Sequence, residues 1–149
     1  MTDDQIIEVT EIALKEVAIE QKALLKTGRV ERTFSTRLRD KLLPIFQVDS
    51  ITVDAPYNRH GENTKRLNGG AIELDVAVHQ PFTDDHNVLA IEMKTHNNPS
   101  EESDIKKLKG LTLVGGGYGY QLGLFVVFGI ESKAGKILKM VWFKDGEKL

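Results

Sequence analysis

The chain has 149 residues, of which 40% are hydrophobic and 28% are charged, and its formal net charge is −2. This composition is typical of a single globular domain, and the near-neutral charge excludes strong non-specific attraction of the whole surface to nucleic acid. The absence of cysteine excludes disulfides and thiolate metal sites and favours a cytoplasmic location. The acidic start does not resemble a signal peptide, and no apolar run approaches the ~18 residues of a membrane helix, so no membrane partner is expected.

Two helices are predicted in the first third of the chain, about residues 1–46. Apolar residues recur at helical spacing over residues 3–28. A second helix is predicted over residues 31–46, with Glu31 on the same face as its apolar residues. No linker, repeat or low-complexity segment interrupts the sequence, so residues 1–149 are predicted to form one α/β domain.

The rest of the chain is predicted to be rich in strands. Strands are predicted at 50–57, 71–79, 87–95, 120–130 and 136–143. The strand at 136–143 is expected at the edge of the sheet, where its apolar residues make a homodimer a further hypothesis. A helix is predicted after residue 99, with Ser100 or Ser103 as its cap. Its basic side chains are interpreted as a solvated face: Lys106, Lys107 and Lys109.

The strands at 71–79 and 87–95 carry charged residues where a buried strand normally carries apolar ones. Because side chains alternate across a sheet, Asp75 and His79 are predicted on one face, opposite the face of Leu74 and Val76. In the next strand Glu92 and Lys94 share a face with Val88 and Ala90. If residues 80–87 form a simple hairpin loop, with His79 opposite Val88, then Asp75 lies directly across from Glu92.

Two carboxylates at cross-strand distance repel each other and raise each other's pKa. A divalent cation between them removes this conflict, and carboxylate oxygens suit Mg²⁺ or Mn²⁺. Lys94 stands one step beyond Glu92 on the same face, within reach of a phosphate or of a water molecule on the metal. Asp75, Glu92 and Lys94 are therefore predicted to form one site.

Asp75 followed across a predicted hairpin by Glu92-Met93-Lys94 resembles the signature of the PD-(D/E)XK nucleases, the restriction-endonuclease-like superfamily. The order of a helix, three antiparallel strands, a helix and a strand over roughly residues 29–130 is also similar to that superfamily. Leu74 stands where many members have proline. The resemblance implies a restriction-endonuclease-like core, with a central mixed sheet of four to five strands flanked by helices and an extra N-terminal helix.

The resemblance also implies an activity, the metal-dependent hydrolysis of phosphodiester bonds in DNA, and a role for each residue. Asp75 and Glu92 would bind Mg²⁺ with the Met93 backbone carbonyl as a further ligand. Lys94 would orient or help deprotonate the attacking water. Many members carry an acidic residue on the first core helix, and Glu31 is the best match. The polar loop at 59–70 offers basic side chains for contact with nucleic acid: Arg59, Lys65 and Arg66.

Two readings from other classes stay open. One is a non-cleaving nucleic-acid-binding or protein-interaction module that keeps the fold and these charges. The other is a structural protein in which Glu92 and Lys94 form an incidental surface ion pair, worth under ~1 kcal/mol. The four histidines match no zinc-binding pattern and are interpreted as surface or loop residues.

Overall fold

The computed structural model describes residues 1–28, 31–48, 50–57, 59–60, 63–64, 66–67, 70–71, 73–98 and 100–149, and it describes only the backbone of Glu31 and of the described residues in 59–71. Within these residues a six-stranded sheet has the order β1-β6-β7-β8-β9-β10. The strands are β1 (Thr52–Asp54), β6 (Val76–His79), β7 (Asn87–Thr95), β8 (Leu122–Phe128), β9 (Ile137–Lys144) and β10 (Glu147–Lys148). Strands β7 and β8 pair in parallel and the other neighbours pair antiparallel, so the sheet is mixed.

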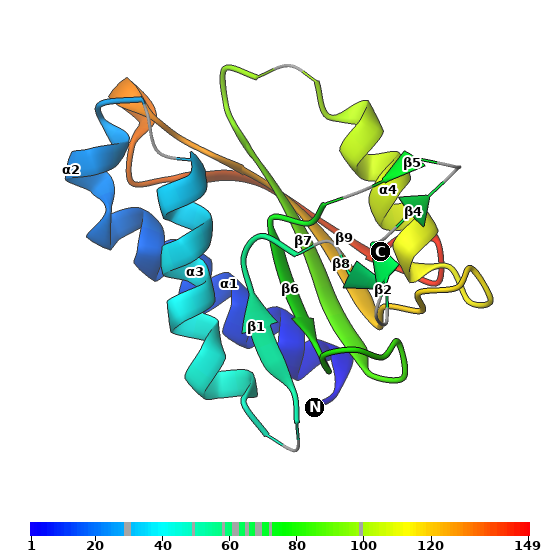
Figure 1. Cartoon of the computed structure of the whole chain (residues 1–149). Helices are drawn as coiled ribbons and strands as arrows, with labels where there is room; N and C mark the ends of the chain where they lie inside the picture. Colours follow the sequence, from blue (N-terminus) through cyan, green and yellow to red (C-terminus); the bar gives the residue numbers. More distant parts are fainter. Residues whose placement is uncertain are drawn as a thin grey trace.

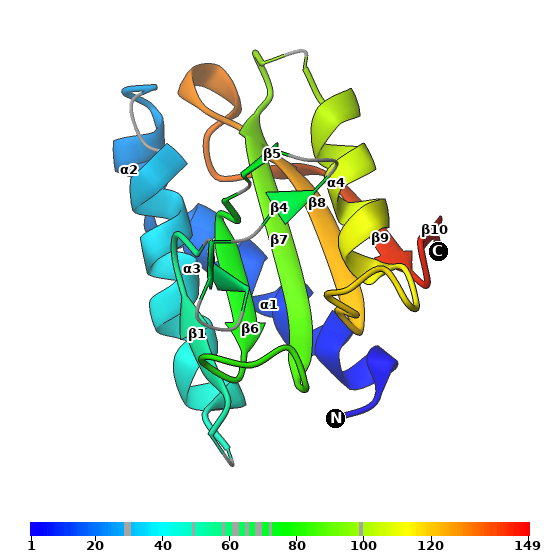
Figure 2. The ribbon, with the colours of Figure 1, turned by 45° about the vertical axis from the view of Figure 1, so that its right-hand side comes forward.

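Helices cover both faces of this sheet (Figure 1 and Figure 2). Helices α1 (Asp3–Glu20) and α3 (Glu31–Phe46) pack on one face, with the short α2 (Lys22–Leu25) between them in the chain. Helix α4 (Glu102–Thr112) packs on the other face. The remaining elements are the 3-10 helix η1 (Glu131–Lys133) and two short ribbons, β2 (Arg59–His60) with β3 (Asn63–Thr64) and β4 (Arg66–Leu67) with β5 (Gly70–Ala71). The predicted α/β class is confirmed.

Local sequence explains where the N-terminal helices begin and what they bury. Thr2 caps α1 by accepting a hydrogen bond from the Gln5 backbone N–H, and the Gln5 side-chain oxygen accepts one from the Thr2 backbone N–H. Helix α3 spans the predicted residues 31–46, and its buried face includes Phe34, which stacks on Phe128 of β8 at 4.3 Å between ring centroids. The apolar faces of these helices build the larger of the two cores.

Two predictions about individual elements are wrong. The sheet has six strands among the described residues and not the predicted four to five, because β10 pairs with Phe143 and Lys144 at the end of β9. No described strand pairs with residues 137–141 of β9 on the outer side, so this part keeps the edge position predicted for residues 136–143. Helix α4 begins after Glu101, and neither Ser100 nor Ser103 caps it. The homodimer hypothesis for the β9 edge stays a prediction.

The predicted strand at 71–79 is shorter than expected. Strand β6 begins only at Val76, because the chain bends at Asp75 and Leu74 forms an isolated bridge with Tyr57. The bend shifts the alternation, so Leu74 packs with Ala77 on the α4 side and not with Val76. Asp75 therefore occupies a bend at the start of a strand and not its interior. No helix in the described part of the chain is both long and apolar enough to cross a membrane.

Candidate functional site

Asp75 and Glu92 lie side by side at the point where β6 begins. Val76 pairs with Ile91, so the next residue pair in the same register is Asp75 with Glu92, as predicted. The Met93 backbone N–H donates a 2.7 Å hydrogen bond to Asp75 Oδ2, which fixes the carboxyl group against β7. The Asp75 and Glu92 carboxyl groups lie close enough to shift each other's pKa. The two predicted ligands are thus immediate neighbours.

The register differs from the prediction at the other end of the hairpin. A bulge after Val78 places His79 opposite Asn87 and not opposite Val88. The bulge lies beyond Val78 and leaves the Asp75 end unchanged. His79 itself is fully buried, with Nε2 2.8 Å from an Asp54 carboxylate oxygen and its ring on Tyr57, so its interpretation as a surface histidine is wrong.

The buried carboxyl groups of the site hold their protons more tightly than usual. Glu92 is 4% exposed, and burial raises its pKa from 4.5 to about 9, with the neighbouring charge of Asp75 adding to the shift. Burial also raises the pKa of Asp75, although the Met93 N–H and the neighbouring Glu92 side chain oppose the shift. With a pKa of about 9, Glu92 is protonated near neutral pH, which removes one of the two repelling charges.

Two lysines approach this pair, and the one nearer to Glu92 is not the predicted one. Lys107 of α4 places its Nζ 3.2 Å from Glu92 Oε1 and 3.3 Å from the Glu73 backbone carbonyl oxygen. Lys94 is on the predicted face of β7, but its Nζ lies 3.5 Å from Asp104 Oδ2. The interpretation of Lys107 as part of a solvated helix face is wrong, because it points into the site.

Asp104 and Lys107 were both missed as site residues by sequence reasoning. They stand three residues apart on α4, and Lys107 Nζ is 3.9 Å from Asp104 Oδ1. Asp104 is 5% exposed, and its Oδ2 atom has no hydrogen bond within the described structure. Its charge raises the pKa of both Asp75 and Glu92. An acid and a base three apart on a helix after the motif strand are the only signal that the sequence offered.

The donor set fits a hard divalent cation. Because the N–H and C=O of a strand residue face the same side, the Met93 carbonyl faces the edge where its N–H meets Asp75. Two carboxylates and one carbonyl can bind Mg²⁺ or Mn²⁺ when water fills the other positions. No group of three or more His, Asp or Glu side chains in the described residues is arranged to hold an ion, so protein side chains alone do not complete a shell. The Lys107 ammonium, between Glu92 and the Glu73 carbonyl, already occupies a cation position.

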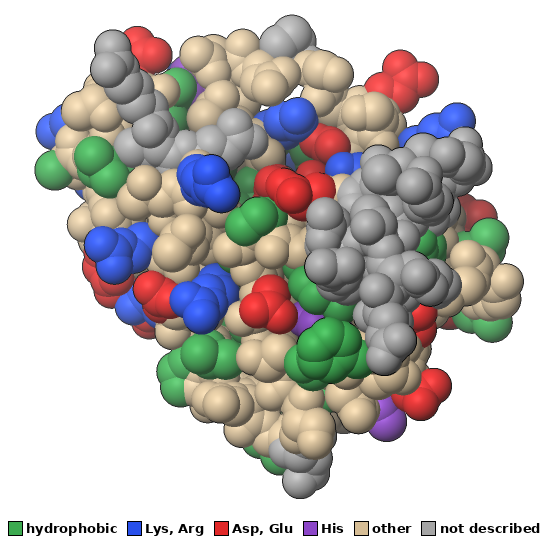
Figure 3. Space-filling view, in the orientation of Figure 1, with side chains coloured by type: hydrophobic (Ala, Val, Ile, Leu, Met, Phe, Trp, Pro, Cys, Tyr) green, Lys and Arg blue, Asp and Glu red, His purple; other side chains and the backbone are tan. Residues whose placement is uncertain are grey.

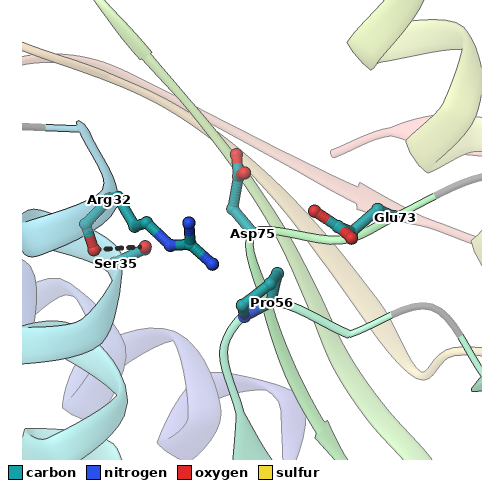
Figure 4. A pocket seen from close by; sticks show the side chains of 5 residues that line it. All are labelled: Arg32, Ser35, Pro56, Glu73 and Asp75. Carbon is teal, nitrogen blue, oxygen red and sulfur yellow. Dashed lines mark hydrogen bonds between the residues drawn. The ribbon is translucent and has the colours of Figure 1, made fainter.

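A cavity of about 300 Å³ opens beside Asp75. Its lining comes from α3, from the end of β1 and from the bend before β6: Arg32, Ser35, Pro56, Glu73 and Asp75. Figure 4 shows the Arg32 side chain reaching across the cavity toward Asp75. Arg32 is a third residue that sequence reasoning missed.

The other predicted residues cannot be placed in the site. Lys65 lies outside the described residues, and Glu31, Arg59 and Arg66 have a described backbone only. On the face of the molecule seen in Figure 3, acidic and basic side chains are interspersed, in keeping with the near-neutral net charge. A scan against models of known protein families and a search of curated proteins find no match for this chain.

Proposed function

We propose that the protein is a metal-dependent nuclease that hydrolyses phosphodiester bonds, with DNA as its substrate. The observation that carries the proposal is the cross-strand pair of Asp75 and Glu92, whose carboxyl groups lie together beside an open cavity. Buried carboxyl groups with raised pKa values concentrate at functional sites. A divalent cation would stabilise both carboxylates and supply Lewis-acid activation of a phosphodiester and of water.

The residues of the site have separable roles under this proposal. Asp75, Glu92 and the Met93 carbonyl hold Mg²⁺ or Mn²⁺. Lys94 orients the attacking water and stabilises the negative charge of the transition state, and Asp104 at 3.5 Å positions its ammonium group. Glu31 completes the metal site from α3.

The order of elements supports the same proposal. Helix α3, the antiparallel strands β1, β6 and β7, helix α4 and the parallel strand β8 follow one another along the chain. This is the order that the resemblance to restriction-endonuclease-like nucleases implies, with the Asp on the second strand and Glu-x-Lys on the third. Asp75 stands in the bend directly before that second strand. The proposal also includes contact between the 59–70 loop and nucleic acid through Arg59, Lys65 and Arg66. It further includes a homodimer that forms at β9.

A second candidate function rests on Lys107. Its ammonium lies between Glu92 and the Glu73 carbonyl, so the charges can balance one another without metal. A module with such a self-contained cluster would bind nucleic acid or protein and would never cut DNA. The two candidates therefore differ in whether Mg²⁺ produces cleavage.

The test is a cleavage assay on labelled DNA with Mg²⁺, with Mn²⁺ and with EDTA. The wild-type protein should cut only when the metal is present. Asp75→Asn and Glu92→Gln should each abolish cleavage and leave the circular dichroism spectrum unchanged. Asp85→Asn is the matched control, because Asp85 is an exposed carboxylate in the β6–β7 turn, at the opposite end of the hairpin. Equal residual cutting by all variants would assign the activity to a contaminant, and no cutting by the wild type would leave the binding module as the function.

A further inference from the structure

The cavity beside Asp75 has walls of different chemistry. Helix α3 contributes Arg32 and Ser35, and Pro56 forms an apolar part of the lining. The opposite wall is formed by Glu73 and Asp75 at the bend before β6. The cavity has a volume of about 300 Å³, at the lower end of the range for small-ligand sites. This volume suits a single nucleotide of one strand better than a duplex.

Arg32 differs from the basic side chains further along α3. Arg39 is paired with Asp40 at 3.0 Å, and Lys41 is paired with two glutamates of α1. Arg32 has an exposed side chain and forms no ion pair with any described residue. Figure 4 shows its guanidinium group directed across the cavity toward Asp75. An unpaired guanidinium on the wall of a cavity is suited to bidentate binding of a phosphate group.

A second hollow lies along α3 and shares Arg32 with this cavity. It has a volume of about 410 Å³ and is lined by residues of the same helix: Arg32, Thr33, Thr36 and Arg37. Arg32 lines both hollows, and Arg37 is exposed and likewise has no ion pair with a described residue. The two arginines and the hydroxyl groups beside them offer successive contacts to the backbone of one strand.

We propose that the exposed face of α3 binds the phosphodiester backbone of a single nucleic-acid strand, with Arg32 contacting the phosphate beside the carboxyl pair and Arg37 contacting the next. The placement of the reacting phosphate near Asp75 rests on the proposed nuclease function. The binding itself does not, because Arg32 and Arg37 act without metal. Arg32 thereby positions the strand at one wall of the cavity while Asp75 and Glu92 form the other side of the site.

The test is the binding of a fluorescently labelled single-stranded DNA oligonucleotide in EDTA, measured by anisotropy over a range of salt concentrations. Arg32→Ala should weaken binding about tenfold, as expected for the loss of a charged hydrogen-bonded contact. It should also make the slope of log affinity against log salt shallower by about 0.7, the value for one phosphate contact on a single strand. Arg32→Ala combined with Arg37→Ala should flatten the slope about twice as much, and Arg32→Lys should keep the wild-type slope.

Lys15→Ala is the matched control, because it removes one exposed positive charge from α1, and Lys15 forms no ion pair with a described residue. It should leave affinity and slope unchanged. Equal slopes for wild type, Arg32→Ala and the double variant would overturn the proposal, as would an equal loss in Lys15→Ala. A slope change without any Mg²⁺-dependent cleavage would keep this inference and reject the nuclease. Cleavage by the wild type with an unchanged slope in Arg32→Ala would keep the nuclease and reject this inference.

Discussion

The two faces of β7 carry side chains of different chemistry. Leu89, Ile91 and Met93 point toward α1 and α3 and are at most 1% exposed in an apolar core. On the opposite face Ala90 packs into the smaller core, but Glu92 and Lys94 meet charged side chains of α4. One strand therefore supplies packing on one side and a buried cluster of charges on the other.

This difference separates residues that stabilise the fold from residues that cost stability. Burial of an apolar side chain contributes about 1.5–3 kcal/mol, whereas a buried charge must be paired or must give up its ionisation. Glu92 does the latter, since its pKa is about 9. A cluster that opposes folding is expected where it serves a function, and each prediction below tests that contrast.

The largest effect is expected for Lys94→Ala. Removing this ammonium should lower the single-turnover cleavage rate by several orders of magnitude, because it would no longer orient water or stabilise the transition-state charge. Affinity for Mn²⁺, measured by calorimetry, should change far less than in Asp75→Ala. A normal cleavage rate in Lys94→Ala would show that Lys94 is only the ion-pair partner of Asp104.

The next largest effect separates two adjacent residues. Ile91→Ala should lower the free energy of unfolding by about 2–5 kcal/mol, because it leaves a cavity in the apolar core. Glu92→Gln should have little effect or should stabilise the apo protein, because it replaces a buried ionisable group with a neutral isostere. Urea unfolding of the two variants measures the change in the free energy of unfolding. An equal decrease in Ile91→Ala and Glu92→Gln would mean that Glu92 stabilises the fold, which favours the non-cleaving binding module.

The third prediction concerns pH. The pKa of Glu92 is raised from 4.5 to about 9 in the folded protein, so the folded state retains a proton that the unfolded state releases. The stability contributed by this proton is complete below pH 4.5 and is lost as the pH rises through 9. Glu92→Gln should therefore gain stability relative to wild type over this window, by at most about 1.4 kcal/mol per pH unit. The measurement is the free energy of unfolding in urea at a series of pH values. Curves of this free energy against pH that run parallel for wild type and Glu92→Gln would contradict the raised pKa of Glu92.

The smallest effect is expected for Lys107→Met. Lys107 occupies a cation position beside Glu92, and its positive charge repels a second cation, so its removal should tighten Mn²⁺ binding several-fold. Lys106→Met is the control, since Lys106 is the exposed neighbour on the same helix. Weaker Mn²⁺ binding in Lys107→Met would show that Lys107 supports the metal site and does not compete with the ion.

Much of this site could be predicted because strand periodicity is local. The alternation of Ile91, Glu92 and Lys94 holds because β7 is regular, and the register from Val76 to Ile91 follows from a short hairpin. The shift at Leu74 could not be predicted, because a bend resets the alternation without a glycine or proline to signal it. The role of Lys107 was missed for a different reason. Its distance from Glu92 depends on how α4 packs on the sheet, which no spacing within the helix specifies.

Arg32 could not be recognised either, because a single arginine in the first turns of a helix is usually solvated. Its place in the site follows from the cavity between α3 and the bend at Asp75, which depends on how α3 packs on the sheet. The charge total gave no hint, since the net charge of −2 averages over local differences.

A crystal structure of the wild-type protein soaked in Mn²⁺ tests the central claim most directly. We predict an anomalous peak between the Asp75 and Glu92 carboxylates, with the Met93 carbonyl among its ligands and the Lys107 ammonium displaced from Glu92. Oxygen ligands should lie roughly 2.1–2.2 Å from the ion, slightly beyond the distance for Mg²⁺. Lys107 still bound to Glu92, with no peak at the carboxyl pair at saturating Mn²⁺, would contradict the account.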